Sequence, residues 1–357
     1  MSNYIEYNDT VAFHPGYYIK EIVEESGLTQ DDFAKRLGTT PKNLSLLVRG
    51  EQNLSIDIAN KLSRMLGTSV SFWLNLQQAY DEKLAEYLSY EELKNERGIF
   101  KSIDYKYFRD NFGLPDLKRK IDEQIKAVRE FLSVSSLSVL GQTSLVVSFR
   151  SNPSGLTETN VINANVMTQI AVNQVIRTDA PKFDKYKFEK AVSFALTQTK
   201  NHESFLPLIK DAFNKAGVVL VVLPNLKGSG ISGATKRVDG KIMLMVNDRR
   251  HYADSFWFTL FHEIGHIMNG TFGITLNNEA EDEADLYAKN KLIPSDEYNA
   301  FIVENKVFNE SVIRDFAESI GRDPGIVYGR LQKDNYISYA DTRLSSRLRH
   351  KYKIIVS

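Results

Sequence analysis

The segment FTLFHEIGHIMNG, residues 258–270, decides how the second half of this 357-residue chain is interpreted. His262 and His266 are four residues apart, so on a helix both imidazoles point to the same side, about one turn from each other. A hydrolytic zinc ion needs three protein ligands and one open position for water. Glu263, between the histidines, is placed to act as general base on that water. The segment therefore predicts a buried helix that carries two metal ligands and a base.

The third ligand is expected from a second helix further along the chain. The segment EAEDEADLYAKNKLIP, residues 279–294, is acidic and ends at a proline, which stops a helix. Glu281 and Asp285 are four residues apart in it. This spacing presents Glu281 to the metal, with Asp285 behind it to accept a hydrogen bond from a ligand histidine. Glu279 and Glu283 are the alternative ligands.

The competing interpretation is a chance pattern on a core helix, with histidines satisfied by the neighbouring backbone. The chain has no cysteine, so any metal must be held by histidine and carboxylate. The apolar residues around the motif favour the metal site, because burying unpaired histidine and glutamate is costly. Two further histidines, His202 and His251, are interpreted as surface or satisfied residues rather than ligands.

Two apolar segments precede the metal-binding motif. Residues 216–224 (AGVVLVVLP) and 240–247 (GKIMLMVN) are expected to form buried strands joined by a glycine-rich loop. The stretch 242–247 is the candidate edge strand for pairing with an extended substrate, the alternative being a plain core strand. The sequence does not choose among five candidates for stabilising an oxyanion, which are His251, Tyr252, Tyr287, Tyr328 and Arg330.

The first part of the chain has the pattern of a helix-turn-helix. From His14 to Tyr80, turn residues separate five short helical segments, and TQDDFAKRLGTTPKNLSLLVRG, residues 29–50, has the form in which the second helix enters the major groove of DNA. Between Lys35 and Arg64 there are six basic residues against two acidic ones. The residues expected to face bases are Thr40, Lys42, Asn43 and Ser45, and those expected near phosphates are Gln30 and Arg49.

The alternative for this part is a five-helix bundle that binds another protein. A local basic patch is needed for DNA, because Lys plus Arg equals Asp plus Glu at 45 each over the whole chain. If the DNA interpretation holds, a homodimer is expected, since one helix-turn-helix reads only a half-site. The amino terminus lacks a signal-peptide pattern and the apolar runs are too short to span a bilayer, so we expect no membrane association and a cytoplasmic location.

Two known families resemble these segments. Residues 14–81, HPGYYIKEIVEESG through WLNLQQAYD, resemble the HigA-type antitoxin branch of the XRE helix-turn-helix family. Residues 216–294 resemble the ImmA/IrrE family of zinc metallopeptidases, and DPGIVYGRLQKDNYI, residues 323–337, resembles the tail of proteins that fuse the two. The resemblance implies zinc bound by His262, His266 and Glu281, with Glu263 as base and the third helix as the DNA reader. One departure is Asp285, where the peptidase family often has Asn.

The resemblance and the patterns together predict a mainly α protein with a small β-sheet, in four parts. They are an N-terminal five-helix helix-turn-helix domain (1–80), a helical connector (81–180), an α+β zincin-like metallopeptidase domain (181–300) and a C-terminal helical extension (301–357). The Ser-rich stretch 133–155 is expected to be a hinge with one short strand.

Three functions are consistent with these features. The first is a regulator that binds operator DNA and carries a zinc endopeptidase that cleaves a repressor or another regulatory protein, in a toxin-antitoxin or mobile-element operon. The second is a non-catalytic antitoxin or repressor whose peptidase-like domain senses a ligand or binds a toxin. The third, a general protease, ranks last because such an enzyme has little use for a sequence-specific DNA reader.

Overall fold

The computed structural model describes residues 3–142, 157–272 and 278–352. The chain divides into two compact units, Met1–Asn95 and Glu96–Ser357, and each is described by itself. The division falls inside helix α5 (Val70–Phe100). The expected border between residues 80 and 81 therefore lies within a helix that continues to Phe100.

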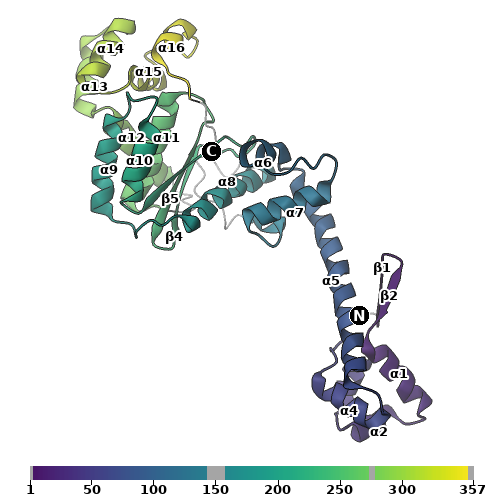
Figure 1. Cartoon of the computed structure of the whole chain (residues 1–357). Coiled ribbons are helices and arrows are strands. Elements are labelled where there is room, and N and C mark those ends of the chain that lie inside the picture. The colour runs from purple at the N-terminus through teal and green to yellow at the C-terminus, as the bar shows by residue number, and fades with distance from the viewer. Residues whose placement is uncertain (1–2, 143–156, 273–277, 353–357) are drawn as a thin grey trace. The chain divides into compact units, whose positions relative to one another are not determined.

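The first unit is a small helical domain with a β-hairpin at its start (Figure 1). The hairpin, whose antiparallel strands are β1 (Tyr4–Tyr7) and β2 (Thr10–Phe13), was not expected from the sequence. The five expected helices are confirmed: α1 (Pro15–Glu25), α2 (Gln30–Leu37), α3 (Pro41–Val48), α4 (Ile56–Leu66) and α5.

Local capping explains where the short helices begin and end. Thr29, Thr40 and Ser55 cap α2, α3 and α4, and each side chain accepts a hydrogen bond from the backbone N–H three residues on. Gly38 follows α2 with φ +70°, a left-handed conformation that glycine adopts without strain, so the chain can turn sharply into α3. This turn sets the relative direction of α2 and α3.

The second unit is mainly helical around one small sheet. Its helices before the sheet are α6 (Tyr105–Phe112), α7 (Ile121–Leu132), the short 3₁₀ helix η1 (Leu137–Gly141), α8 (Glu158–Arg177), α9 (Lys185–Thr197) and α10 (Phe205–Asn214). Those after it are α11 (Ala253–Asn269), α12 (Asn278–Leu292), α13 (Ser295–Glu304), α14 (Glu310–Ser319), α15 (Pro324–Lys333) and α16 (Thr342–Leu348). Part of the expected hinge with a short strand, residues 143–155, lies outside the described residues; its described part contains η1.

The sheet has three strands in the order β3 (Val218–Leu223), β5 (Lys241–Asn247), β4 (Gly233–Val238). Strands β3 and β5 are parallel and confirm the two expected buried strands, whereas β4 is antiparallel to β5 and lies where the sequence predicted a loop. The expectation that residues 242–247 form an edge strand is wrong, because β5 is hydrogen-bonded on both sides. The edge strand that neighbours β5 on its antiparallel side is β4.

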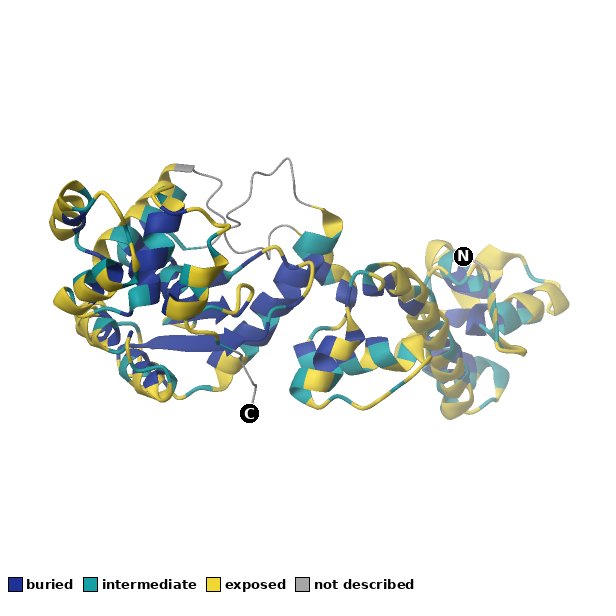
Figure 2. Ribbon diagram, turned by 90° about the horizontal axis from the view of Figure 1, so that it is seen from above, coloured by how far each residue is buried: buried dark blue, intermediate teal, exposed yellow. Residues whose placement is uncertain are grey.

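Alternate side chains of the buried strands face two different layers of helices. Val218, Leu220 and Val222 of β3 belong to the large core formed with α9, α10 and α11. The intervening residues of the strand are also buried and face the other side, where α8 contacts all three strands (Figure 1). Figure 2 shows the sheet coloured as buried along most of its length. Helix α11, which carries the HEIGH motif, is therefore fixed on a rigid sheet.

Candidate metal centre and nucleic-acid interface

Close packing of α11 against α12 brings the metal-ligand candidates together. Gly265 of α11 faces Ala284 of α12, and a Cβ added to Gly265 would lie 3.0 Å from the Ala284 Cα. Only a glycine lets the two backbones approach so closely without displacement. The contact places the acidic residues of α12 opposite the histidines of α11.

His262, His266 and Glu281 meet at one point. The Nε2 atoms of the two histidines are 3.2 Å apart. The Glu281 carboxylate lies beside both, with Oε2 3.4 Å from Nε2 of His262 and Oε1 3.3 Å from Nε2 of His266. The histidines are 3% and 2% exposed, so little water reaches them. The three side chains form the group of described residues that could hold a metal ion.

These separations fit a tetrahedral ion. Zinc binds histidine nitrogen and carboxylate oxygen at about 2.0–2.2 Å in tetrahedral geometry, which puts neighbouring ligand atoms about 3.3–3.5 Å apart. The observed 3.2–3.4 Å falls in or next to this range. Three protein ligands also leave the fourth position open, as hydrolysis requires.

The hydrogen bonds on the far sides of the imidazoles support the same interpretation. His262 Nδ1 lies 2.8 Å from Asp285 Oδ1, a carboxylate that accepts, so this nitrogen carries a proton. His266 Nδ1 lies 3.0 Å from Oγ1 of Thr271, whose hydroxyl donates to the His266 carbonyl oxygen. In the tautomer with both Nδ1 atoms protonated, each Nε2 lone pair points towards the Glu281 carboxylate. A cation between these three groups would suit that arrangement.

Electrostatics keep the Glu281 carboxylate ionised. Burial raises its pKa, but hydrogen bonds and charge interactions with His262 and His266 outweigh burial and lower the pKa to about 2. Oε2 of Glu281 is buried and lies 3.4 Å from Nε2 of His262, without a hydrogen bond of good geometry among the described residues. A cation at this point would neutralise the carboxylate.

A C-terminal helix, α15, contacts Asp285 and helps to hold its carboxylate in place. Lys333 of α15 donates from Nζ to Asp285 Oδ2 at 3.1 Å and lies 4.5 Å from the ring centre of Phe258 on α11. The second carboxylate oxygen of Asp285 is thus held while the first contacts His262. The sequence analysis missed Lys333, because only the fold shows that α15 reaches α12.

Glu263, the expected base, lies beside the start of the edge strand β4. It is 7% exposed, and a Cβ added to Gly233 of β4 would come within 2.6 Å of its Cγ and Oε1. Any side chain at position 233 would displace Glu263. The absence of a side chain there leaves the base directly beside the backbone of β4.

The alternative ligands and the oxyanion candidates differ from the three clustered residues in their surroundings. Glu279 and Glu283 are exposed on α12, in contrast to Glu281. The oxyanion candidates contact other groups. Tyr252 stacks under Arg349, His251 is exposed beside Asp248, Tyr287 is 5.7 Å from Lys291, Tyr328 donates to the Asp341 carbonyl, and Arg330 pairs with Asp334.

His202 also has partners of its own. Its Nε2 lies 2.9 Å from Asp323 Oδ2, its Nδ1 lies 2.9 Å from the Tyr352 hydroxyl, and its ring stacks on that of His350. These contacts fasten the end of the described chain to the core. His202 is a structural residue here.

The expected DNA-reading residues gather at the amino-terminal end of α3. Leu44 and Leu47 are buried in the core of the first unit, whereas Thr40, Lys42 and Asn43 are exposed. The Thr40 hydroxyl caps the helix by accepting from the Asn43 N–H at 3.1 Å, so its backbone position is fixed. Thr40 and Asn43 line a hollow of about 470 Å³ between α3 and α4.

The remaining residues of this set differ in their surroundings. Gln30, at the start of α2, is exposed. Arg49 donates to both carboxylate oxygens of Glu51, at 2.9 and 3.1 Å, and to the Ser45 hydroxyl at 3.0 Å. A phosphate contact by Arg49 therefore requires exchange of the Glu51 carboxylate for the phosphate. The sequence pattern did not reveal this ion pair.

Comparison with known proteins identifies the first unit. The helix-turn-helix family matches residues 19–73. Virulence-associated protein I of Dichelobacter nodosus is 36% identical over 80 residues, which are 22% of this chain and 74% of that protein. Antitoxin HigA-1 of Vibrio cholerae is 32% identical over 84 residues, 24% of this chain and 79% of that protein. A solved addiction-module antidote protein of a HigA family from Coxiella burnetii is 30% identical, covers 24% of this chain and 92% of its own, and has a TM-score of 0.22.

Within the ranges that the structure describes, no helix is both long and apolar enough to cross a membrane.

Proposed function

The chain belongs to the helix-turn-helix family through residues 19–73, and from this premise we propose that it is a DNA-binding transcriptional regulator of the antitoxin type that also carries a zinc-dependent endopeptidase. The peptidase half rests on one observation, the convergence of His262, His266 and Glu281 with spacings suited to a tetrahedral ion. The DNA half rests on the family and on the exposed start of α3.

The proposed DNA partner is a double-stranded operator. The exposed start of α3 enters the major groove, where Asn43 can bind an adenine edge through two hydrogen bonds and Lys42 can bind a base or a phosphate. Because one such domain reads a half-site, we propose that a homodimer binds a palindrome. The mass of the complex with DNA measures this stoichiometry.

Replacing Lys42 and Asn43 together by Ala is expected to weaken operator binding by about 100-fold, since each good base contact contributes about 1–3 kcal/mol. The measurement is titration of a labelled palindrome from upstream of the chain's own operon, at fixed salt. Lys20→Ala is the matched control, because Lys20 lies on α1 and pairs with Glu24. Equal affinity of the double variant and the wild type would refute the recognition-helix assignment.

The proposed peptidase chemistry uses the residues around Glu281. When bound by His262, His266 and Glu281, zinc lowers the pKa of a water molecule towards about 7 and polarises a carbonyl. Glu263 accepts a proton from the attacking water and returns it to the leaving amine. Asp285 keeps the His262 ring oriented with its Nε2 lone pair towards the ion.

The edge strand suits this chemistry. An extended peptide that pairs with the backbone of β4 passes Gly233 and therefore lies next to Glu263. Such pairing favours an unfolded or extended segment of a protein as the substrate. We propose that this segment belongs to a repressor or another regulatory protein, by analogy with the ImmA/IrrE family that residues 216–294 resemble.

Replacing Asp285 by Ala is expected to weaken zinc binding by about 10–100-fold, the usual effect of losing a group that orients a metal-ligating histidine. Competition against a chromogenic chelator measures the affinity. Lys333→Met is expected to have a smaller effect, because Lys333 contacts Asp285 and not a proposed zinc ligand. Asp282→Ala, an exposed acid on the same helix, is the control. If Asp285→Ala and Asp282→Ala bind zinc equally, the supporting role of Asp285 is excluded.

A second candidate function is a non-catalytic antitoxin in which the second unit binds a toxin or senses a ligand. A relative favours it, because the protein from Vibrio cholerae that is 32% identical to this chain over 84 residues is named an antitoxin. The two candidates differ in one observable, a cut fragment whose formation requires Glu263.

A further inference from the structure

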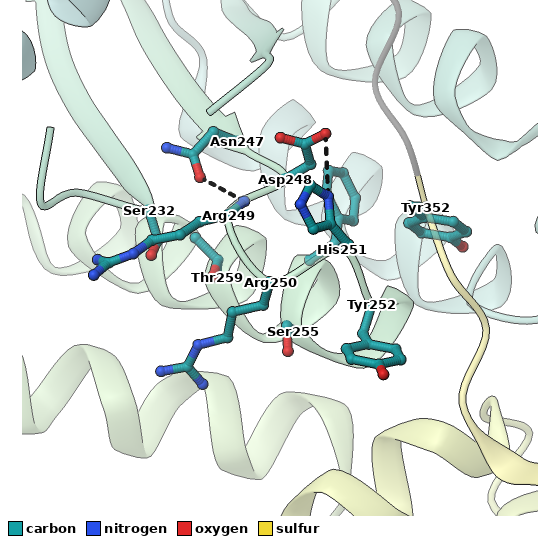
Figure 3. A pocket seen from close by; sticks show the side chains of 11 residues that line it. Ser232, Asn247, Asp248, Arg249, Arg250, His251, Tyr252, Ser255, Thr259 and Tyr352 are labelled. Atoms are coloured by element: carbon teal, nitrogen blue, oxygen red, sulfur yellow. Dashed lines mark hydrogen bonds and ion pairs between the residues drawn. The ribbon is translucent and has the colours of Figure 1, made fainter. Parts of the chain in front are cut away.

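A small hollow lies at the amino-terminal end of α11, beside the point where β4 begins (Figure 3). Ser232, immediately before β4, and Thr259 of α11 line it. The enclosed space is about 20 Å³, close to that of one water molecule. It therefore accepts a group as small as a carboxylate and excludes a large apolar side chain.

The hollow lies close in sequence to the proposed general base, Glu263. Thr259 precedes Glu263 by four residues, so both lie on one face of α11, about 6 Å apart along the helix axis. Ser232 is adjacent to Gly233, which abuts Glu263, and its carbonyl accepts from the Asn247 N–H at 2.9 Å. A peptide lying along β4 advances about 3.3 Å per residue, so the hollow faces a residue about two positions from the bond next to Glu263.

The charge around the hollow is positive. Arg249 and Arg250 are exposed at its rim, and Figure 3 shows both guanidinium groups directed away from Asp248. Arg249 is held by a hydrogen bond from Nη1 to the Gly230 carbonyl at 2.9 Å. Among the residues that the structure describes, neither arginine has a carboxylate within ion-pair distance.

One acidic residue, Asp248, also lines the hollow. Asp248 is buried, accepts from the Asn225 N–H at 2.9 Å and lies 3.6 Å from His251 Nδ1. Two arginine side chains beside a hollow of this size are suited to binding a carboxylate, for which arginine has the matching geometry.

We propose that this hollow is a substrate subsite for a carboxylate, bound by Arg250 and Arg249, so that the peptidase selects chains with an acidic group about two residues from the scissile bond. The inference rests on the proposed peptidase function. The carboxylate comes either from an Asp or Glu side chain or from the carboxyl terminus of the substrate, and both present the same chemistry to the arginines.

The test uses the zinc-loaded full chain and mixtures of short peptides with random neutral residues. In matched mixtures one position carries Asp or Asn, and the carboxyl terminus is either free or amidated. Wild-type protein is expected to cleave the Asp mixture about tenfold or more faster than the Asn mixture when Asp occupies the selected position, because hydrogen bonds to charged groups are strong. If faster cleavage depends instead on a free carboxyl terminus, the subsite binds the terminal carboxylate of the substrate.

Arg250→Gln is expected to reduce the Asp-to-Asn ratio towards one, and Arg250→Glu is expected to reverse the preference towards Lys. Arg177→Gln, at an exposed arginine that ends α8, is the matched control and should keep the wild-type ratio. Cleavage by wild-type protein without any preference for an acidic group, or a preference that survives in Arg250→Glu, would overturn the proposal.

A binding measurement separates this proposal from the peptidase proposal. The Glu263→Gln chain is titrated with the same labelled peptides by fluorescence anisotropy. Arg250-dependent binding of acidic peptides without cleavage by the wild type would retain the subsite and reject the peptidase. Cleavage without acid preference would retain the peptidase and reject the subsite. If the protein shows no binding preference for acidic peptides and no cleavage, both proposals are rejected.

Discussion

Replacing Glu263 by Gln is expected to lower the rate of peptide cleavage by about 10²–10⁴-fold, the usual contribution of a general base. Gln has nearly the same shape as Glu, so it preserves the contact with Gly233 but cannot accept the proton of the attacking water. Zinc content should not change, because Glu263 is not a ligand in the proposed site. The measurement is the yield of cut fragments, by intact-mass spectrometry, from this chain itself and from repressors encoded beside it.

The matched control for this variant is Glu283→Gln, an exposed glutamate of α12. It removes the same charge and should leave the fragments at the wild-type level. Fragments produced equally by the wild type and by Glu263→Gln would remove the peptidase half of the proposed function. A chain that yields no fragments but still represses its operator would then support the non-catalytic antitoxin.

Local geometry explains why sequence reasoning predicted that His262, His266 and Glu281 come together. The spacing of His262 and His266 fixes their relative position within one helix, without any knowledge of the fold. The choice of Glu281 over Glu279 and Glu283 depends on how α11 packs against α12. Spacing alone favoured Glu281, and the contact of Gly265 with Ala284 supplies the physical reason.

The third strand could not be predicted in the same way. Its segment, Gly233–Val238, follows a glycine-rich stretch and contains Lys236 and Arg237, so its local preference is for a loop. Pairing with β5 overrides that preference, because the strand completes the hydrogen bonds of a buried neighbour. Because the edge strand is β4 and not β5, the strand available for pairing with a substrate is the one that begins next to Glu263.

Contacts between distant segments are the other feature that the sequence conceals. Lys333 contacts Asp285 across 48 positions of sequence, and no local pattern connects them. Arg49 was expected near a phosphate, yet its guanidinium is already paired with Glu51. In both cases the residue type indicated a charge, and only the fold showed which group that charge contacts.

Replacing Glu281 by Ala is expected to abolish stoichiometric zinc binding. The wild-type chain, purified without chelator, should carry one zinc ion by native mass spectrometry. The variant loses one of three ligands and the negative charge that balances the ion, so its zinc affinity should fall by more than the roughly 10–100-fold caused by losing an orienting group. Binding at about 1,000 times the dissociation constant stabilises a fold by about 4 kcal/mol, so added zinc should raise the melting temperature of the wild type only.

The control is Glu279→Ala, which removes an exposed glutamate two positions away on the same helix. It should keep one zinc ion and the zinc-dependent rise in melting temperature. Equal zinc content in Glu281→Ala and Glu279→Ala would show that the ion, if bound, is held elsewhere. If the wild type takes up no zinc, the zinc site is rejected. A proton shared among His262, His266 and Glu281 would then have to satisfy their facing lone pairs.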